Sequence, residues 1–240
     1  MLVISYNLRK HRAISELAAL DERHEPDVLC LQECDTTDLA ERVGGRLQLA
    51  HSTTGNRLGL AMYYRADRFE PRDIKAFALK KSLHDRVLRP AHERLLGGAR
   101  LIDLEHDRRE FIVASFHAAP PLTALNSLRR HQIRSALGEL QFLGPGLPTL
   151  MVGDYNYPRL PDEPRREGAG RRVRADAQRQ PHVHAVQVLP RALRSRDERG
   201  PRDAERAHTP PRGSSDHLPI LVDAHYHREV TASVPEASTR

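Results

Sequence analysis

The feature that most constrains the fold is a series of short apolar runs, each of which meets a polar side chain at one end. Four of them end at or near an amide, carboxylate or imidazole side chain: "LVISYN" (2–7), "DVLCLQE" (27–33), "EFIVASFHA" (110–118) and "LPTLMVGDYN" (147–156). A fifth run, "LPILVDAHY" (218–226), directly follows Asp216 and His217. Continuous apolar runs of this length are typical of buried strands. Because sites in layered α/β folds gather at strand ends, these polar residues are the first candidates for a functional site.

Apolar residues elsewhere in the chain recur at the spacing of a helix face. This periodicity predicts helices over residues 12–22, 35–45 and 122–140. Further apolar runs predict strands over residues 58–65 and 99–107. Strands that alternate with helices indicate an α/β architecture of packed layers. The length of 240 residues suits one domain, placed at residues 1–226, and the polar stretch 227–240 is expected to be a disordered tail.

The basic character of the chain is confined to one segment. The net charge is +6, and residues 165–206 alone hold twelve arginines against six acidic residues, so the rest of the chain is balanced. A nucleic-acid-binding protein is expected to arrange its basic residues over a binding face. The hypothesis of a basic nucleic-acid-binding protein therefore rests only on the net charge.

The cysteines and the hydropathy bear on the compartment. Cys30 and Cys34 are too close in the chain for a useful disulfide, which fits a reducing compartment such as the cytoplasm. Met1 is followed at once by an apolar tripeptide, without the basic region of a signal peptide, and no run is long enough to span a membrane. We therefore expect a cytoplasmic monomer without a membrane partner.

The candidate site consists of seven polar residues at five predicted strand ends, namely Asn7, Glu33, His117, Asp154, Asn156, Asp216 and His217. Any one of them alone is more often a turn former or a cap than a catalyst, and the lone histidines His11, His51 and His84 are given no role. The joint set is harder to explain by turns. Its oxygen ligands suit a hard cation such as Mg²⁺ or Mn²⁺, and carboxylate with histidine suits activation of water for attack on a phosphate.

Five motifs carry a resemblance to a known superfamily. "SYN", "LCLQE", "SFHAAP", "GDYN" and "SSDH" occur in the order and spacing of the endonuclease/exonuclease/phosphatase superfamily, over residues 1–158 and 211–225. The resemblance implies a DNase I-like fold, which is a four-layer α/β sandwich of two mixed sheets flanked by helices. It also implies hydrolysis of phosphodiesters or phosphomonoesters with a divalent cation. The loops leave the substrate open, with DNA or a small phosphodiester as the default expectation.

The resemblance implies a cation site and its ligands. Glu33 is the expected main metal ligand, with Asn7 and Asp216 nearby, directly or through water. Arg9 stands where some members place a second acidic ligand, which disfavours an arrangement with two metals.

The resemblance also implies the catalytic roles. Asp154 is expected to orient or deprotonate the attacking water, and Asn156 to hold the phosphate or that water. His117 and His217 are expected to donate to phosphate oxygens as charge develops in the transition state.

One segment departs from the superfamily pattern. Between "GDYN" and "SSDH" the pattern calls for an aromatic-rich strand and a buried Asp that fixes the tautomer of the last histidine. Residues 165–209 hold no aromatic residue and no isoleucine, so we expect this segment to lack strand structure and to be disordered or misfolded.

Our hypothesis is that residues 165–209 are translated out of frame between two indels. When residues 176–198 are back-translated and the reading frame is shifted by one base, synonymous codons exist that encode "TLSDNPTYTRYKFFRGHFDLATS". This peptide has alternating aromatic residues, and the expected Asp falls at about the position of Arg194. The alternative is a natural basic insertion. Under the frameshift hypothesis the chain folds poorly and hydrolyses weakly, so the competing function is that of an impaired family member, a binding module or a non-functional product.

Overall fold

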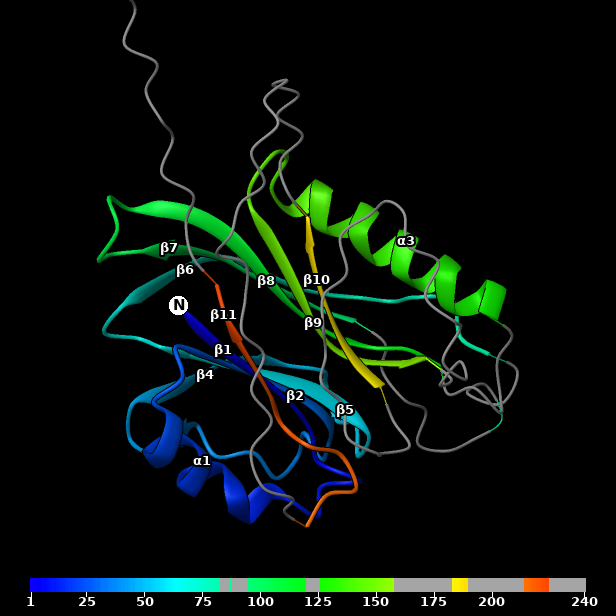
Figure 1. The fold of residues 1–240 in the computed structure, drawn as a ribbon, viewed down its shortest axis with the longest axis horizontal. Coiled ribbons are helices and arrows are strands. Elements are labelled where there is room, and N and C mark those ends of the chain that lie inside the picture. Colours follow the sequence, from blue (N-terminus) through cyan, green and yellow to red (C-terminus); the bar gives the residue numbers. More distant parts are fainter. Residues whose placement is uncertain (83–86, 88–94, 120–125, 158–182, 190–213, 225–240) are drawn as a thin grey trace, which may run out of the picture.

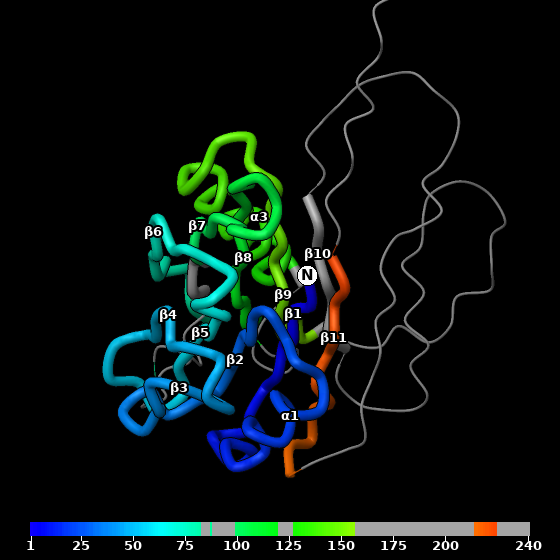
Figure 2. The backbone as a smooth tube through the Cα atoms, turned by 90° about the vertical axis from the view of Figure 1, so that its left-hand side faces the viewer, coloured from blue at the N-terminus to red at the C-terminus, as the bar shows by residue number. Residues whose placement is uncertain are grey.

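Two mixed β-sheets pack face to face, and one helix lies against the outer face of each (Figure 1). The computed structural model describes residues 1–82, 87, 95–119, 126–157, 183–189 and 214–224. Figure 2 shows the same layers from the side, with the two helices on opposite sides of the stack. The predicted four-layer α/β sandwich is therefore confirmed.

The first sheet has the strand order β11-β1-β2-β5-β4-β3. Its strands are β1 (Leu2–Asn7), β2 (Val28–Cys34), β3 (Arg42–Val43), β4 (Leu47–Ser52), β5 (Gly59–Arg65) and β11 (Ile220–Asp223). Strands β1 and β2 are parallel, and the other neighbours in this sheet are antiparallel.

The second sheet has the strand order β10-β9-β8-β7-β6. Its strands are β6 (Phe69–Phe77), β7 (Leu95–Asp103), β8 (Arg109–His117), β9 (Thr149–Tyr157) and β10 (Val183–Leu189). Strands β8 and β9 are parallel, and the other pairs are antiparallel.

Each sheet contains one parallel pair whose connection includes a helix. A short 3-10 helix, η1 (Ile14–Glu16), leads into α1 (Leu17–His24) between β1 and β2, and α3 (Asn126–Leu143) lies between β8 and β9. Because the strands of a parallel pair end at the same edge of the sheet, each pair brings two of the polar strand ends together.

Three apolar clusters hold the layers together. Alternate residues of each strand face opposite sides, so Val3 and Cys30 pack between the sheets while Ile4 and Leu29 pack toward α1. A third cluster lies between the second sheet and α3 and includes Ala136 of the helix. None of the helices in the described ranges has both the length and the hydropathy of a membrane span.

The predicted helix over residues 35–45 is wrong. Asp35 accepts hydrogen bonds from the main-chain N–H and the hydroxyl of Thr37, which forms a local turn in place of a helical start. Gly44 and Gly45 have positive φ values of 59° and 82° and connect β3 to β4 in a hairpin. Gly44 and Gly45 therefore form the turn of a hairpin.

The structure also corrects the description of the anomalous segment. Residues 183–189 form β10, which pairs antiparallel with β9, so the expectation that residues 165–209 lack a strand is wrong for this part. The edge of β9 offers main-chain donors and acceptors, and the valine-rich "VHAVQVL" suits a strand without strict alternation. Residues 165–182 and 190–209, with Arg194, and the tail from 227 lie outside the described residues.

Candidate active site

Four strand ends meet between the two sheets. Asn7 ends β1, Glu33 lies near the end of β2, His117 ends β8, and Asp154 lies on β9 paired with His117. The amide Nδ2 of Asn7 donates to Asp154 Oδ2 at 3.1 Å and approaches Glu33 Oε1 at 3.4 Å. His117 Nε2 lies 3.8 Å from Glu33 Oε1 and 4.0 Å from Asp154 Oδ2. The first and second sheets thus contribute to one cluster.

The loop before β11 completes the cluster. His217 Nδ1 lies 3.6 Å from Asp154 Oδ2, and its Nε2 lies 3.6 Å from Asp216 Oδ1. The hydroxyl of Ser215 donates to the main-chain oxygen of Asn7 at 2.7 Å and accepts from the main-chain N–H of His217 at 3.0 Å. This buried serine fixes the loop to the end of β1, and the "SSDH" motif therefore supplies a positioning residue besides Asp216 and His217.

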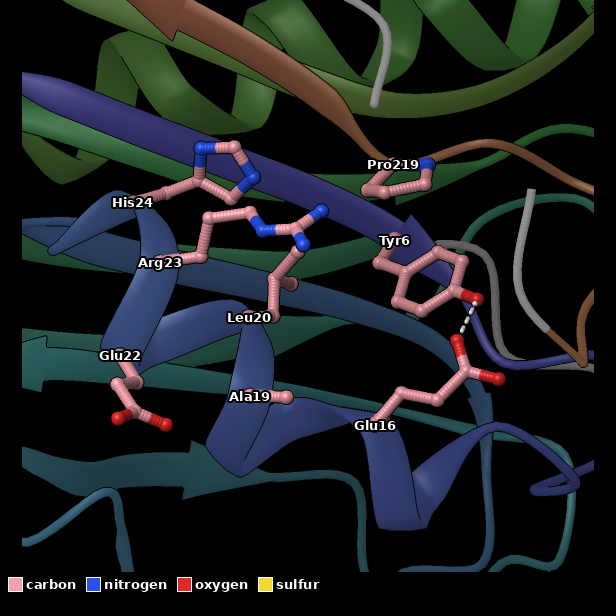
Figure 3. Close-up of a pocket in the computed structure, with 8 residues that line it drawn as sticks. All are labelled: Tyr6, Glu16, Ala19, Leu20, Glu22, Arg23, His24 and Pro219. Atoms are coloured by element: carbon pink, nitrogen blue, oxygen red, sulfur yellow. Dashed lines mark hydrogen bonds between the residues drawn. The ribbon is translucent and has the colours of Figure 1, made fainter. Parts of the chain in front are cut away.

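The same loop is anchored from the other face of the first sheet. Ser214 N–H donates to one carboxylate oxygen of Glu16. The Tyr6 hydroxyl donates to the other at 2.7 Å, as Figure 3 shows. Burial, together with the Glu16 carboxylate, raises the pKa of Tyr6. Tyr6, Glu16 and Pro219 line a pocket of about 510 Å³ beside α1. Because Tyr6 and Asn7 are consecutive in β1, they face opposite sides, and this pocket is separate from the cluster.

Glu33 reaches the cluster through a β-bulge. On β2, Gln32 pairs with Leu60 and Cys34 with Gly59, so Glu33 is an extra residue without a partner on β5. Its φ is 53°, in the left-handed region. An extra residue of this kind re-aims a side chain and is common next to functional sites.

Asp154 and Asn156 are held by contacts with each other and with the main chain of Ala118, directly after β8. Asp154 Oδ1 accepts the main-chain N–H of Asn156 at 2.9 Å, and Asn156 has a positive φ of 48°. Asn156 Nδ2 donates to the carbonyl of Ala118 at 2.9 Å, and Ala118 N–H donates to the carbonyl of Asp154 at 2.8 Å. Both polar side chains are nearly fully buried.

A polar bridge between the sheets lies beneath the cluster. Gln32 Nε2 donates to Ser115 Oγ at 2.9 Å and contacts Ser5 Oγ at 3.2 Å, and Ser115 Oγ donates to the carbonyl of Leu31 at 3.3 Å. All three side chains are fully buried. Sequence reasoning gave these residues no role, although polar residues inside apolar runs are the signal that would have found them.

Two carboxylates of the cluster, Glu33 and Asp154, have no lysine or arginine partner among the described residues, and the exposed fraction of Asp154 is 1%. Asp216 Oδ1 is buried without a hydrogen-bond partner, while Arg9 Nε lies 3.4 Å from Asp216 Oδ2. Buried carboxylates are costly without a cation, and oxygen donors such as these suit Mg²⁺ or Mn²⁺.

A second group of metal-ligand types has a different role. Asp103, Glu105 and His106 lie close enough to share an ion. The guanidinium of Arg68 already occupies this position, with Nη2 3.1 Å from Asp103 Oδ2 and Nε 3.2 Å from Glu105. This group is therefore a salt-bridge network, at the opposite end of the strands from the cluster.

The structure brings together all seven residues named from the sequence. The interpretation of His11 changes, because it is half-buried and contacts both Glu33, through its main-chain N–H, and Asp35, through its ring.

Comparisons with known proteins give the family. Residues 4–229 match the model of the Endonuclease/Exonuclease/phosphatase family. Protein angel of Drosophila melanogaster is 30% identical over 171 residues, which cover 66% of this chain and 45% of that protein, so the chain spans less than half the length of this relative.

Solved structures show the same fold. A mannosyl-6-phosphatase of Bacteroides thetaiotaomicron has a TM-score of 0.62 at 16% identity, covering 94% of this chain and 100% of that one. An endonuclease/exonuclease/phosphatase family protein from the same organism has a TM-score of 0.61 at 15% identity, covering 92% of this chain and 96% of that one. With two mixed sheets, the clustered strand ends and a family match over nearly its whole length, the chain belongs to the Endonuclease/Exonuclease/phosphatase family.

Proposed function

We propose that this chain is a hydrolase of phosphoesters that depends on a divalent cation, Mg²⁺ or Mn²⁺. The observation that carries the proposal is the convergence of two carboxylates, Glu33 and Asp154, with two imidazoles at one buried point, where no lysine or arginine of the described part of the chain pairs with either carboxylate. Family membership supports the same class of reaction.

Glu33 is the central ligand of the proposed cation, with Asn7 and Asp216 beside it. A divalent cation bound there would neutralise phosphate oxygens and lower the pKa of a bound water. Arg9 pairs with Asp216, which supports one cation rather than two because the guanidinium supplies positive charge at that side of the cluster.

The remaining residues would act on the water and the phosphate. Asp154 orients an attacking water and accepts its proton, since its carboxylate is held in place by Asn7 and by the main chain of Asn156. His117 and His217 flank this carboxylate and donate to phosphate oxygens as charge develops. Asn156 holds the phosphate or the water.

The substrate proposal is a phosphodiester, either DNA or a small molecule. The alternative is an impaired member of the family that acts as a binding module. The presence of all seven residues in one cluster favours the hydrolase. We further propose that residues 1–226 form the catalytic domain and that it acts as a cytoplasmic monomer.

Hydrolysis of bis-p-nitrophenyl phosphate, with and without EDTA, tests the proposal. We expect EDTA to abolish turnover, Mg²⁺ or Mn²⁺ to restore it, and Asp154→Asn or Glu33→Gln to lower kcat by about 10²–10⁴-fold. Glu70→Gln is the control, because Glu70 pairs with Arg108 on the surface. Turnover that resists EDTA and survives Asp154→Asn would contradict the proposal. A panel with p-nitrophenyl phosphate, single-stranded DNA and duplex DNA then tests the phosphodiester assignment.

A further inference from the structure

The loop that follows β1 folds back over Glu33. Leu8 N–H donates to the carbonyl of Gln32, Lys10 N–H to the carboxylate Oε2 of Glu33 at 3.0 Å, and His11 N–H to the carbonyl of Glu33 at 2.8 Å. Residues 9–11 all have positive φ, from 48° to 68°. Three consecutive left-handed residues other than glycine persist only where their surroundings impose that conformation.

The His11 side chain makes the second half of this contact. Asp35 N–H donates to His11 Nδ1 at 2.9 Å, and His11 Nε2 lies 3.4 Å from Asp38 Oδ2. Because Nδ1 accepts this hydrogen bond, the ring acts here as an acceptor for the main chain of Asp35. His11 therefore holds the chain at two points. Its main-chain N–H binds Glu33, and its ring binds the main chain of Asp35.

These contacts matter because Glu33 is the unpaired residue of the bulge. Leu29 and Leu31 of β2 face α1, so in a regular strand Glu33 would face α1 as well, away from His117 and Asp154. Instead, Cys34 takes that position in the α1 cluster. The bulge costs the regular pairing with β5, and the loop at residues 8–11 supplies hydrogen bonds in its place.

We propose that His11 is a positioning residue that keeps the Glu33 bulge in the orientation required for cation binding. This inference rests on the proposed function, in which Glu33 is the central ligand. His11 itself reaches no reacting group, and its effect passes through the carbonyl of Glu33 and the N–H of Asp35.

Two substitutions separate the hydrogen bond from the backbone conformation. In His11→Asn, the amide Oδ1 is separated from the main chain by as many covalent bonds as Nδ1 is in histidine. It can therefore accept from Asp35 N–H. Asn also tolerates a positive φ. His11→Gly suits the positive φ equally but has no acceptor. The two variants therefore differ in whether residue 11 has a side-chain acceptor for Asp35 N–H.

The first measurement is the Mg²⁺ concentration for half-maximal hydrolysis of bis-p-nitrophenyl phosphate. We expect His11→Gly to raise it about 10–100-fold, the usual effect of removing a group that orients a metal ligand. His11→Asn is expected to stay within about threefold of wild type, with KM for the substrate unchanged in both. In a Glu33→Gln background, His11→Gly should not raise this Mg²⁺ concentration further, because both substitutions act on the same metal ligand.

The second measurement is hydrogen exchange at the Asp35 amide without metal. We expect slow exchange in wild type and His11→Asn and fast exchange in His11→Gly. Equal exchange in the two variants, or equal Mg²⁺ requirements, would overturn the role of His11. If wild type shows no metal-dependent hydrolysis, the proposed function fails, while the exchange rates still decide whether the ring of His11 holds Asp35.

Discussion

At Gly153, the main chain of β9 passes so close to β8 that a side chain does not fit. Gly153 pairs with Phe116, and a Cβ at this position would overlap the Phe116 carbonyl. Its φ is 152°, which residues with side chains rarely adopt. The next pair along the two strands is His117 with Asp154. The close approach therefore sets the distance between two of the proposed catalytic side chains.

Gly153→Ala tests this close approach. We expect it to lower the free energy of unfolding by about 3 kcal/mol, because the strands must separate and the backbone is strained. Gly138→Ala is the matched control, since Gly138 lies inside α3 with open space around it and should stabilise the helix by about 0.5–1 kcal/mol. Urea unfolding of both variants measures these values. If Gly153→Ala lowers the free energy of unfolding no more than an ordinary surface substitution does, the close approach at Gly153 does not constrain the strands.

At the scale of elements, the loop before β11 depends on the helix segment on the far side of β1. Glu16 accepts from Ser214 and from Tyr6 and so connects η1, β1 and the loop that carries Asp216 and His217. Partial burial acts to raise the pKa of Glu16, but the hydrogen bonds from Ser214 and Tyr6 outweigh it and hold the pKa below the usual 4.5. The ionised carboxylate therefore stabilises the loop.

This shift predicts a pH dependence. A carboxyl whose folded pKa is lowered contributes stability above its unfolded pKa and loses it as the pH falls through the folded pKa. We expect Glu16→Gln to cost about 0.5–1 kcal/mol at pH 7, limited by solvent screening, and the difference from wild type to shrink well below pH 4.5. The free energy of unfolding of both proteins, measured at pH 7 and at acidic pH, gives this difference. Glu22→Gln, on the exposed side of α1, should show neither effect, and a difference that persists in acid would contradict the assignment.

At the scale of the whole molecule, the two sheets are joined by polar contacts at both ends of their strands. The site residues join them at one end. At the other end, Arg68 Nη1 lies 2.8 Å from Asp27 Oδ1, just before β2, and Nη2 lies 3.1 Å from Asp103 Oδ2, at the end of β7. Burial acts to raise the pKa of Asp103, and hydrogen bonds from Arg68 and His106 lower it overall.

Arg68→Met should separate stability from activity. We expect a loss of about 3 kcal/mol in the free energy of unfolding, because two buried carboxylates lose the arginine they share while Asp27 keeps Arg65 and Asp103 keeps His106. The kcat of the folded protein should be unchanged. Arg108→Met removes a surface pair with Glu70 and should cost less than about 1 kcal/mol. A fall in kcat together with stability would show that the remote network also shapes the site.

The α/β layering and the seven candidate residues could be predicted from the sequence alone, and the resemblance of five motifs to a known superfamily implied the two-sheet sandwich. The layering and the candidate residues depend on local information, since apolar runs define the strands and each polar residue marks where a strand ends. The tertiary structure decided the rest, because it depends on partners distant in the chain. The hairpin at Gly44 replaced a helix because β4 was available to pair, and β10 formed where β9 offered an edge. His11 gained its contacts only when β1 and β2 lay side by side, because the bulge that directs Glu33 inward is a property of strand pairing and not of composition.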